Sequence, residues 1–569
     1  MKHAIVIRNG SIVDGSGAPA FTGDVGISDG LIAEIGDIPQ QGRREIDAAG
    51  MVVSPGFIDG HTHMDAQIHW DALGSCSCWH GVTSVVMGNC GFTLAPVRTE
   101  TRKLLMRNLE RAEDISVAAM EQGIEWRWET FPEYMRVLDG LPKGINYAVN
   151  IGHSALRTWA MGERAFDGPA DQDDLQRMEQ QLRAALHAGA IGFTTTQTNH
   201  HEMSDGRPVA SRLATWDEIR RLAAVLGQTG AGIFELAPAP AWAHPDAAIR
   251  GEYMTKLKAL ALDDRVPITL PVIPGPVAET CWRDQLGLMA GINAAGGCMF
   301  GQAHPRGVTI LMSFLGQLPF DKLPEWSKLR TLPTDQQKQR LRDPELCARL
   351  VHEAHHGDYG HAIGPEARKP DWAQFFVFDR PFPPYPTVSA EAARRGRDPV
   401  QTMIDMALES DFQRTFLQYM GKMPEQDDLL AVMRDPNVVT TFSDTGAHVG
   451  QISDAALQAY FIALWARERQ AFSLEQAVRM VTAVPAQRWG LADRGLLRTG
   501  MAADINVFDF ARLTPGMPVM TSDLPGGARR FVNKTDGIRA TLVGGEILME
   551  RGEHTGALPG RILRGPLAR

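Results

Sequence analysis

Short apolar runs alternate with helical stretches along most of the chain after Met51. Runs of unbroken apolar character are typical of strands that are covered on both faces, and their alternation with helices predicts a parallel sheet. We therefore expect an α/β fold, a TIM-like (β/α)8 barrel with its active site at the C-terminal ends of the strands. The candidate strands are Val52–Asp59, Val82–Met87, Asn146–Ile151, Ala190–Thr195, Gly232–Leu236, Val266–Val272, Cys298–Gln302 and Val438–Phe442.

The two ends of the chain have a different pattern, in which short alternating segments are separated by turns. Asn9-Gly10 and Asp29-Gly30 are strong hairpin signals because both residue types tolerate positive φ. Segments of the same character return near the C-terminus. We expect residues 1–54 and 490–569 to form a small β-sandwich domain, with the barrel in residues 55–489. The segments are Ala4–Arg8, Gly10–Val13, Asp24–Ile27, Leu31–Ile35, Asp504–Asp509 and Ala540–Leu548.

The interval 306–437 is far longer than a loop between a strand and a helix. It contains the proline-rich segment 381–386 and several aromatic residues, among them Trp372 and Phe375. One interpretation is an ornament or an oligomer contact. We favour a lid over the pocket, because the insertion falls between the last two strands, at the catalytic mouth.

Composition narrows the class of protein. The chain has 569 residues, of which 44% are hydrophobic and 22% charged, as is ordinary for a soluble globular enzyme. A net charge of −10 provides no basic face for nucleic acid. Six cysteines do not make a disulfide scaffold and indicate a reducing compartment. Because there is neither a secretory signal nor a run of roughly twenty apolar residues, we expect a cytoplasmic protein that does not bind a membrane. Assembly into a homo-oligomer is left open.

His61 and His63 follow directly after the first predicted strand. Residues two apart in an extended segment point to the same side, so both imidazoles can hold one ion. Imidazole suits zinc and its first-row neighbours. The alternative is a pair of ordinary surface histidines.

Polar residues at the other predicted strand ends are further candidates. Asp444 is the preferred catalytic base, because a carboxylate beside a metal-activated water can take its proton and return it to the leaving amine. The alternative for Asp444 is a capping role in the Ser-Asp-Thr-Gly turn. Convergence of so many ligand-type residues at one face of a barrel is hard to explain as packing. The other candidates are Cys90 for the metal, His153, Glu235 and His304 for metal or substrate, and His448 for substrate.

Four arginines near the predicted mouth, Arg157, Arg207, Arg212 and Arg306, are candidates for binding a substrate carboxylate. A guanidinium group can form two parallel hydrogen bonds to a carboxylate. The alternative for each is a surface or structural role.

Several motifs, spread over nearly the whole chain, resemble those of the metal-dependent amidohydrolase superfamily. Within it they are similar to the N-acyl-D-amino-acid deacylase (D-aminoacylase) branch. The resemblance implies a barrel with a β-sandwich built from both chain ends, and hydrolysis of an amide bond. The motifs lie at Pro55–His63, Gly88–Phe92, Ser204–Arg207, Phe442–His448, Asp523–Arg529 and Thr555–Arg561.

The resemblance also implies roles for single residues. It makes Cys90 a zinc ligand, and it assigns Asp444 both a metal contact and the proton shuttle. Members of this branch carry a histidine at the ends of strands five and six, whereas this chain has Ile233–Ala237 and Ile268–Ile273 there, without histidine. We therefore expect one zinc ion rather than two, held by His61, His63 and Asp444 with Cys90.

The main functional hypothesis is a metal-dependent hydrolase that cleaves a linear amide, such as an N-acyl-D-amino acid or a related N-acyl compound. Metal-activated water would attack the acyl carbonyl, with Asp444 as proton shuttle. A second hypothesis keeps this chemistry for a cyclic amide, a carbamate or a bulky aromatic amide, because loops determine substrate choice. A third, of another class, is a metal-free binding or scaffold protein.

Overall fold

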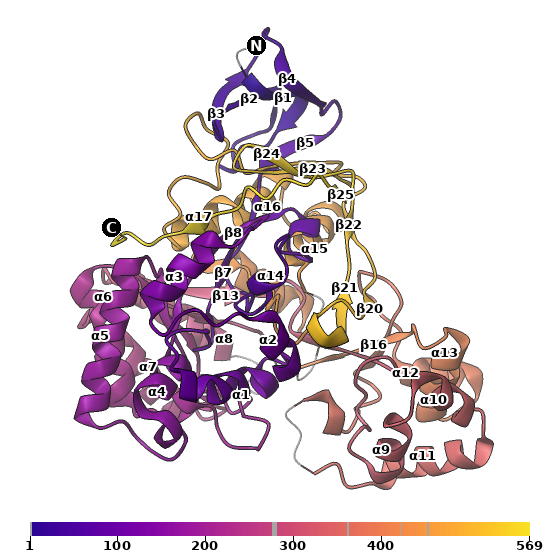
Figure 1. The fold of residues 1–569 in the computed structure, drawn as a ribbon. Coiled ribbons are helices and arrows are strands. Elements are labelled where there is room, and N and C mark those ends of the chain that lie inside the picture. Colours follow the sequence, from indigo (N-terminus) through magenta and orange to yellow (C-terminus); the bar gives the residue numbers. More distant parts are fainter. Residues whose placement is uncertain (1–2, 276–280, 361–363, 421–422, 452–453, 569) are drawn as a thin grey trace.

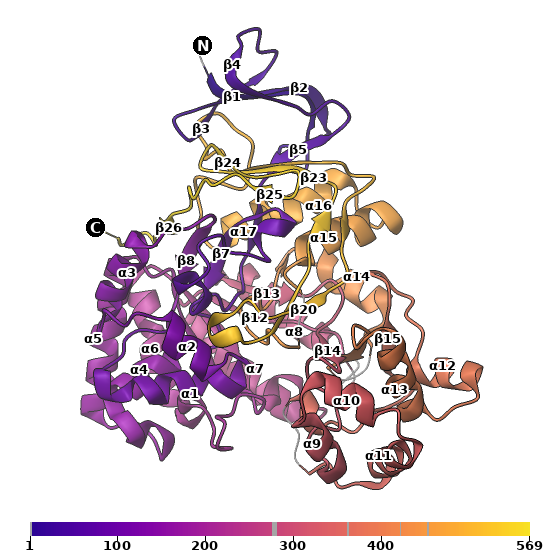
Figure 2. The same cartoon turned by 45° about the vertical axis from the view of Figure 1, so that its right-hand side comes forward.

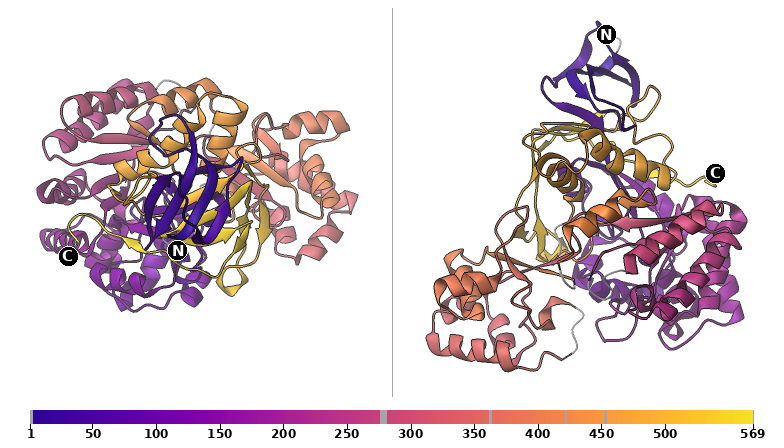
Figure 3. Two further views of the ribbon diagram at one scale, coloured as in Figure 1. Left: turned by 90° about the horizontal axis from the view of Figure 1, so that it is seen from above. Right: turned by 180° about the vertical axis from the view of Figure 1, so that it is seen from behind.

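The structure, a computed structural model, describes residues 3–275, 281–360, 364–420, 423–451 and 454–568. Figure 1 shows three parts. A β-rich part carries the N-terminus, a central part combines strands and helices, and a largely helical lobe projects to one side. Figures 2 and 3 show the same separation of the lobe from other directions.

The central part contains parallel strands that follow one another in chain order, except that β26, from the C-terminal end of the chain, pairs with β8. One hydrogen-bonded sheet has the order β26-β8-β7-β6 and another the order β17-β13-β12-β11-β10-β9. Only Asn150 separates β8 from β9, and at the other junction Thr62 and Thr445 form a parallel bridge between the segments after β6 and β17. The strands are β6 (Phe57–Asp59), β7 (Val82–Met87), β8 (Asn146–Val149), β9 (Ile151–Gly152), β10 (Gly192–Thr196), β11 (Ile233–Ala237), β12 (Ile268–Pro271), β13 (Met299–Ala303), β17 (Val438–Thr440) and β26 (Ile562–Leu563).

Amphipathic helices connect these strands. In α5 (Gln172–Ala188), the Asp171 side chain caps the N-terminus and Gly189 ends the helix with a φ of 106°. The buried face of α5 includes Leu175, Met178 and Leu182, which pack into the main hydrophobic core. Other helices of this part are α1 (Arg102–Ala112), α2 (Val117–Gly123), α3 (Phe131–Gly140), α4 (His153–Met161), α6 (Trp216–Thr229), α7 (Ala247–Leu262), α8 (Cys281–Ala294), α14 (Gln426–Arg434), α15 (Leu457–Phe461), α16 (Leu474–Val481) and α17 (Ala483–Arg488).

Strands from both chain ends pair in one sheet of nine strands, as far as the structure describes the chain. The strand β5 (Val52–Pro55) joins the ends, because it pairs in parallel with β1 and antiparallel with β18. The strands predicted for a sandwich thus belong to one continuous sheet around an aliphatic core that includes Ile7, Val25 and Ile505. The other strands are β1 (His3–Ile12), β2 (Phe21–Ser28), β3 (Leu31–Gly36), β4 (Gly42–Asp47), β18 (Ile505–Phe508), β23 (Ile538–Val543), β24 (Glu546–Glu550) and β25 (Glu553–His554). Short pairs β19 (Thr514–Pro515) with β22 (Thr535–Asp536), and β20 (Val519–Thr521) with β21 (Arg530–Val532), lie nearby.

Two sequence predictions for this region need correction. Asn9-Gly10 does not form a hairpin: β1 continues through it with a shift in register, and Asn9 has a φ of 60°. The predicted strand Val52–Asp59 is two strands, β5 in the end sheet and β6 in the central part. The change occurs at Gly56, where a Cβ atom would lie 2.2 Å from Thr83 Oγ1, so only glycine allows this close approach.

The projecting lobe is formed by the long insertion and has its own hydrophobic core, which includes Trp326, Phe375 and Met403. Its antiparallel sheet has the order β14-β16-β15. The elements are β14 (Thr309–Ser313), β15 (Phe375–Phe378), β16 (Thr415–Tyr419), α9 (Pro324–Arg330), α10 (Thr334–Arg340), α11 (Pro344–His356), α12 (Val388–Arg395) and α13 (Pro399–Glu409). The insertion is therefore a folded unit rather than a long irregular loop.

None of the helices in the described part of the chain combines the length and the apolar character that a bilayer-spanning segment needs.

Candidate metal and active site

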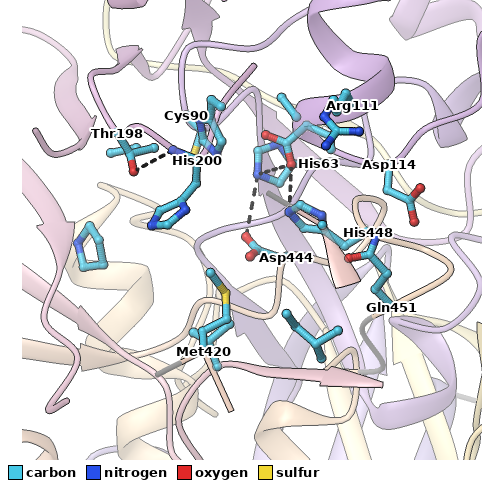
Figure 4. A pocket seen from close by; sticks show the side chains of 18 of the residues that line it. His63, Cys90, Arg111, Asp114, Thr198, His200, Met420, Asp444, His448 and Gln451 are labelled. Carbon is cyan, nitrogen blue, oxygen red and sulfur yellow. Dashed lines mark hydrogen bonds and ion pairs between the residues drawn. The ribbon is translucent and has the colours of Figure 1, made fainter. Parts of the chain in front are cut away.

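A cavity of about 490 Å³ lies where the central strands end. Its wall combines residues that follow β6, β7, β11 and β17 with residues of the insertion. Figure 4 shows His63, Cys90, Asp444 and His448 pointing into it. The predicted site residues that line the cavity are His61, His63, Cys90, Glu235, Asp444 and His448.

His61 is fully buried and oriented by one hydrogen bond. Its Nδ1 lies 2.7 Å from the Gln302 Oε1 atom, a carbonyl oxygen that can only accept, so Nδ1 carries the proton. The Nε2 atom, with its lone pair, lies 3.3 Å from Asp444 Oδ1 and 3.5 Å from Cys90 Sγ. Burial lowers the pKa of His61 to about 4, which keeps the ring neutral at pH 7.

His63 extends the same group of atoms. Its Nε2 lies 3.6 Å from Asp444 Oδ1 and 3.6 Å from Glu113 Oε2. Burial lowers the pKa of His63 to about 3. The ring is therefore neutral and can offer a lone pair to a cation.

Cys90 stands at a tight turn after β7, with a φ of 53°. Its backbone N–H donates to Glu235 Oε2 over 2.7 Å, which fixes the turn against β11. The candidate ligand atoms of His61, His63 and Cys90 all lie within 4.8 Å of one another. Burial raises the pKa of the Cys90 thiol well above its ordinary value, so a nearby cation is what would stabilise the thiolate.

Asp444 reaches the cluster from the segment after β17. Its φ is 53° and its backbone N–H donates to the His61 carbonyl oxygen over 3.2 Å. The Oδ1 atom is buried and has no hydrogen-bond partner among the described residues. Burial raises the pKa of Asp444. Non-glycine residues at positive φ are uncommon, and their presence at both Cys90 and Asp444 is typical of functional sites.

These residues fit a divalent transition-metal ion, zinc in particular. Two neutral imidazoles, a thiol and a carboxylate are the ligand types that zinc prefers. Leaving a carboxylate oxygen buried without a partner is costly, and a cation removes that cost. Asp444 Oδ1, Glu235 Oε1 and Glu113 Oε1 are all in this situation within the described residues.

A family model described as the amidohydrolase family matches residues 44–249 and 357–549. The chain belongs to the amidohydrolase family. It is a hydrolytic enzyme that acts on amide C–N bonds, so we set the scaffold hypothesis aside.

Relatives and solved structures agree with this assignment. D-aminoacylase of Alcaligenes xylosoxydans xylosoxydans is 27% identical over 565 residues, 98% of this chain and 97% of that protein. A D-aminoacylase structure, described for its binuclear metal center, matches with a TM-score of 0.65 and 23% identity, over 99% of this chain and 100% of that one. N-acyl-D-glutamate deacylase of Bordetella bronchiseptica, complexed with zinc and a phosphonate inhibitor, matches with a TM-score of 0.64 and 22% identity over the same shares. The chain thus falls in the D-aminoacylase branch of the amidohydrolases.

Two predicted site residues of this amidohydrolase, His153 and Arg157, lie outside the cavity. Both are fully buried and contact Glu218 of α6, His153 through Nε2 at 2.9 Å and Arg157 through Nη1 at 2.5 Å. The pair therefore forms a buried ion-pair cluster that fixes α4 against α6. Thr195 Oγ1 lies 2.8 Å from His153 Nδ1, and the Gly168 carbonyl oxygen accepts from Arg157 Nη2 over 2.6 Å. The structure thus gives both side chains protein partners, and their contact with metal or substrate stays a prediction.

His304 and Arg306 do not line this cavity and contact a carboxylate outside it. His304 Nε2 lies 3.2 Å from Asp454 Oδ2, and Arg306 also pairs with Asp454 and lies over the Tyr460 ring. The two remaining arginines are also paired away from the cavity lining, Arg207 with Asp205 at 2.9 Å and Arg212 with Glu202 at 3.8 Å. The structure therefore places these four residues in ion pairs outside the cavity lining, and their contact with substrate stays a prediction.

Several cavity residues were missed from the sequence. Glu113 follows the last residue of α1 and is 1% exposed. Arg111, on the same helix, pairs with Glu366 of the insertion at 3.0 Å, and His200 and His201 follow β10. A search of strand ends overlooks Glu113 and Arg111 because they lie at a helix end. The sequence pattern that could have identified Glu113 is the acidic pair Glu113-Asp114 directly after a helix with an apolar face. His200 is exposed at the cavity rim and His201 is half-buried, and partial burial lowers the pKa of both imidazoles.

Proposed function

We propose that this amidohydrolase cleaves the linear amide bond of an N-acyl-D-amino acid or a related N-acyl compound, with zinc as its cofactor. The observation that carries the proposal is the convergence of His61, His63, Cys90 and Asp444 in one cavity, with ligand-type atoms that protein neighbours leave unsatisfied. The names of the relatives, D-aminoacylase and N-acyl-D-glutamate deacylase, support this substrate class.

The fold that presents these residues is, in this proposal, a single (β/α)8 barrel made from the two parallel sheets. The chain order of the strands, the short gap between β8 and β9, and the bridge between Thr62 and Thr445 support a closed ring. The barrel would span residues 55–489, with 306–437 as its lid. In a barrel of this type, residues after the strands share one face, which is where the cavity lies.

His61, His63, Cys90 and Asp444 would hold the zinc ion. Bound there, zinc polarises the acyl carbonyl and lowers the pKa of water towards 7. Gln302 keeps the His61 proton on Nδ1 and so leaves Nε2 free. Asp444 accepts the proton of the attacking water on its carboxylate and passes it to the nitrogen of the leaving amine.

The cavity wall away from the polar cluster would receive the acyl group. Pro271 and Ile273 line one part of it, and Val308, Ile310 and Met420 of the insertion line another. These apolar side chains suit an acyl chain and exclude water from the reacting bond. The insertion would thus contribute part of the surface that contacts the acyl group.

The test combines zinc content with hydrolysis of paired N-acyl-D- and N-acyl-L-amino acids. His61→Ala and Asp444→Asn are compared with His187→Ala and Asp217→Asn, whose side chains are exposed on the outer helices α5 and α6. We expect zinc in the wild type, loss of zinc in His61→Ala, and loss of turnover in both site variants only. A wild type without zinc, or one that hydrolyses none of the N-acyl compounds, would refute the proposal.

A further inference from the structure

Glu113 is a buried carboxylate of the cavity that the proposed zinc ligands do not include. Its Oε2 lies 3.6 Å from His63 Nε2 and 3.5 Å from His448 Nε2, and it is only 1% exposed. The other oxygen, Oε1, lacks a hydrogen-bond partner in the described ranges of the chain. His63, His448 and Asp444 point into the same part of the cavity (Figure 4).

The backbone holds Glu113 firmly in this position. The His448 N–H donates to the Glu113 carbonyl oxygen over 2.5 Å, and the Gly450 N–H donates to Asp114 Oδ2 over 3.3 Å. The end of α1 is therefore tied to the segment that follows Asp444. This connection holds the Glu113 carboxylate beside His63, one of the proposed zinc ligands.

Protein neighbours do not satisfy the Glu113 carboxylate. Its ion-pair contacts in the described residues are with two imidazoles, those of His63 and His448. Both contacts are longer than ordinary hydrogen bonds. Arg111, two residues before Glu113, pairs with Glu366 instead. A buried carboxylate without a cation partner is unfavourable, so a missing positive charge is the simplest account.

The distances match those between ligands of one ion. Zinc binds nitrogen and carboxylate oxygen at about 2.0–2.2 Å, which places two tetrahedral ligands about 3.3–3.6 Å apart. The 3.6 Å between His63 Nε2 and Glu113 Oε2 falls in this range, as does the 3.3 Å between His61 Nε2 and Asp444 Oδ1. Glu113 therefore lies at ligand-to-ligand distance from His63.

We propose that Glu113 is a metal ligand of this chain, supplied by the end of a helix rather than by a strand end. His448 is the positioning residue that holds its carboxylate towards His63. The anionic donor takes the place of neutral ligands that the ends of β11 and β12, with Glu235 and Pro271, do not supply. The inference rests on the proposed function, from which it takes the presence of zinc.

The experiment measures zinc stoichiometry and affinity by competition with a chromogenic chelator, on metal-free full-length protein. Glu113→Gln keeps the shape of the side chain and removes its charge. Glu110→Gln is the matched control, since Glu110 lies on the same helix and lines the same cavity without contacting His63. We expect Glu113→Gln to weaken zinc binding about 100-fold. Replacing a residue that only hydrogen-bonds to a metal ligand already lowers metal affinity by roughly 10- to 100-fold. Glu110→Gln should bind as the wild type does, and His448→Gln should lie between them.

Equal zinc affinity and stoichiometry in Glu113→Gln and the wild type would overturn the inference, as would a wild type that takes up no zinc. Thermal melting of the metal-free forms separates a structural role: a structural Glu113 would lower the melting temperature of the metal-free variant and leave zinc affinity unchanged. Hydrolysis of N-acyl-amino acids, measured alongside, keeps the two proposals apart. Weakened zinc binding in Glu113→Gln with an inactive wild type would support the ligand and refute the substrate class.

Discussion

Gln302 offers the sharpest test of how the site is tuned. It is fully buried in β13, accepts the His61 Nδ1–H over 2.7 Å, and donates to Thr269 Oγ1 over 3.2 Å. Gln302→Leu removes the acceptor while roughly keeping the volume. In the metal-free variant the His61 proton can move to Nε2, which faces Asp444. Zinc binding requires Nε2 without a proton, so the ion must force a buried Nδ1–H to remain without an acceptor.

That difference sets the expected magnitude. An unsatisfied buried donor costs about 1–3 kcal/mol, so zinc affinity should fall by roughly 5- to 150-fold. This range overlaps the roughly 10- to 100-fold losses of metal affinity seen when a residue hydrogen-bonded to a metal ligand is replaced. Chelator competition at pH 7 measures the affinity. Gln285→Leu is the control, because Gln285 is equally buried and donates to the Trp242 carbonyl oxygen away from the cluster. Unchanged zinc affinity in Gln302→Leu would refute the reasoning.

Three further predictions concern the proton shuttle, the buried ion pair of Arg157 with Glu218, and the lid. Asp444→Asn, saturated with zinc, should lose about 10²- to 10⁴-fold in kcat, as expected for a general base, and a wild-type kcat would contradict that role. Glu218→Gln should lower the free energy of unfolding at pH 7 by about 3–5 kcal/mol, since Arg157 stays buried and unpaired, and denaturant unfolding measures this. The pKa of Glu218 is about 2, because burial, which raises it, is outweighed by His153 and Arg157. About 3 kcal/mol of stability is therefore fully present above pH 4.5 and is lost as the pH falls to 2. This loss of stability between pH 4.5 and pH 2 should be absent in Glu218→Gln. If the variant showed the same loss, groups other than Glu218 would be its cause. Met420→Ala should raise KM about tenfold for long apolar acyl chains without changing the melting temperature, because Met420 lines the cavity yet is 40% exposed. An unchanged KM would place the acyl group elsewhere.

The sequence by itself determined the features that short-range patterns encode. The apolar runs marked the positions of the central strands, and β7 has the predicted bounds, Val82–Met87. The spacing of His61 and His63 placed both rings on one side of an extended segment, because alternation of side chains is a local property of the backbone. Strand-end positions also brought Cys90 and Asp444 to the same cavity.

Only the tertiary structure decided which polar side chains are satisfied by a neighbour and which face the cavity. His153 occupies a strand-end position like that of Cys90, yet its Nε2 contacts Glu218 of α6 instead of facing the cavity. Glu113 follows the end of a helix, and a backbone hydrogen bond to His448, far away in sequence, brings it to His63. Whether a buried charge finds a partner depends on distances between elements that are remote along the chain. Periodicity describes each element separately and contains no information on those distances.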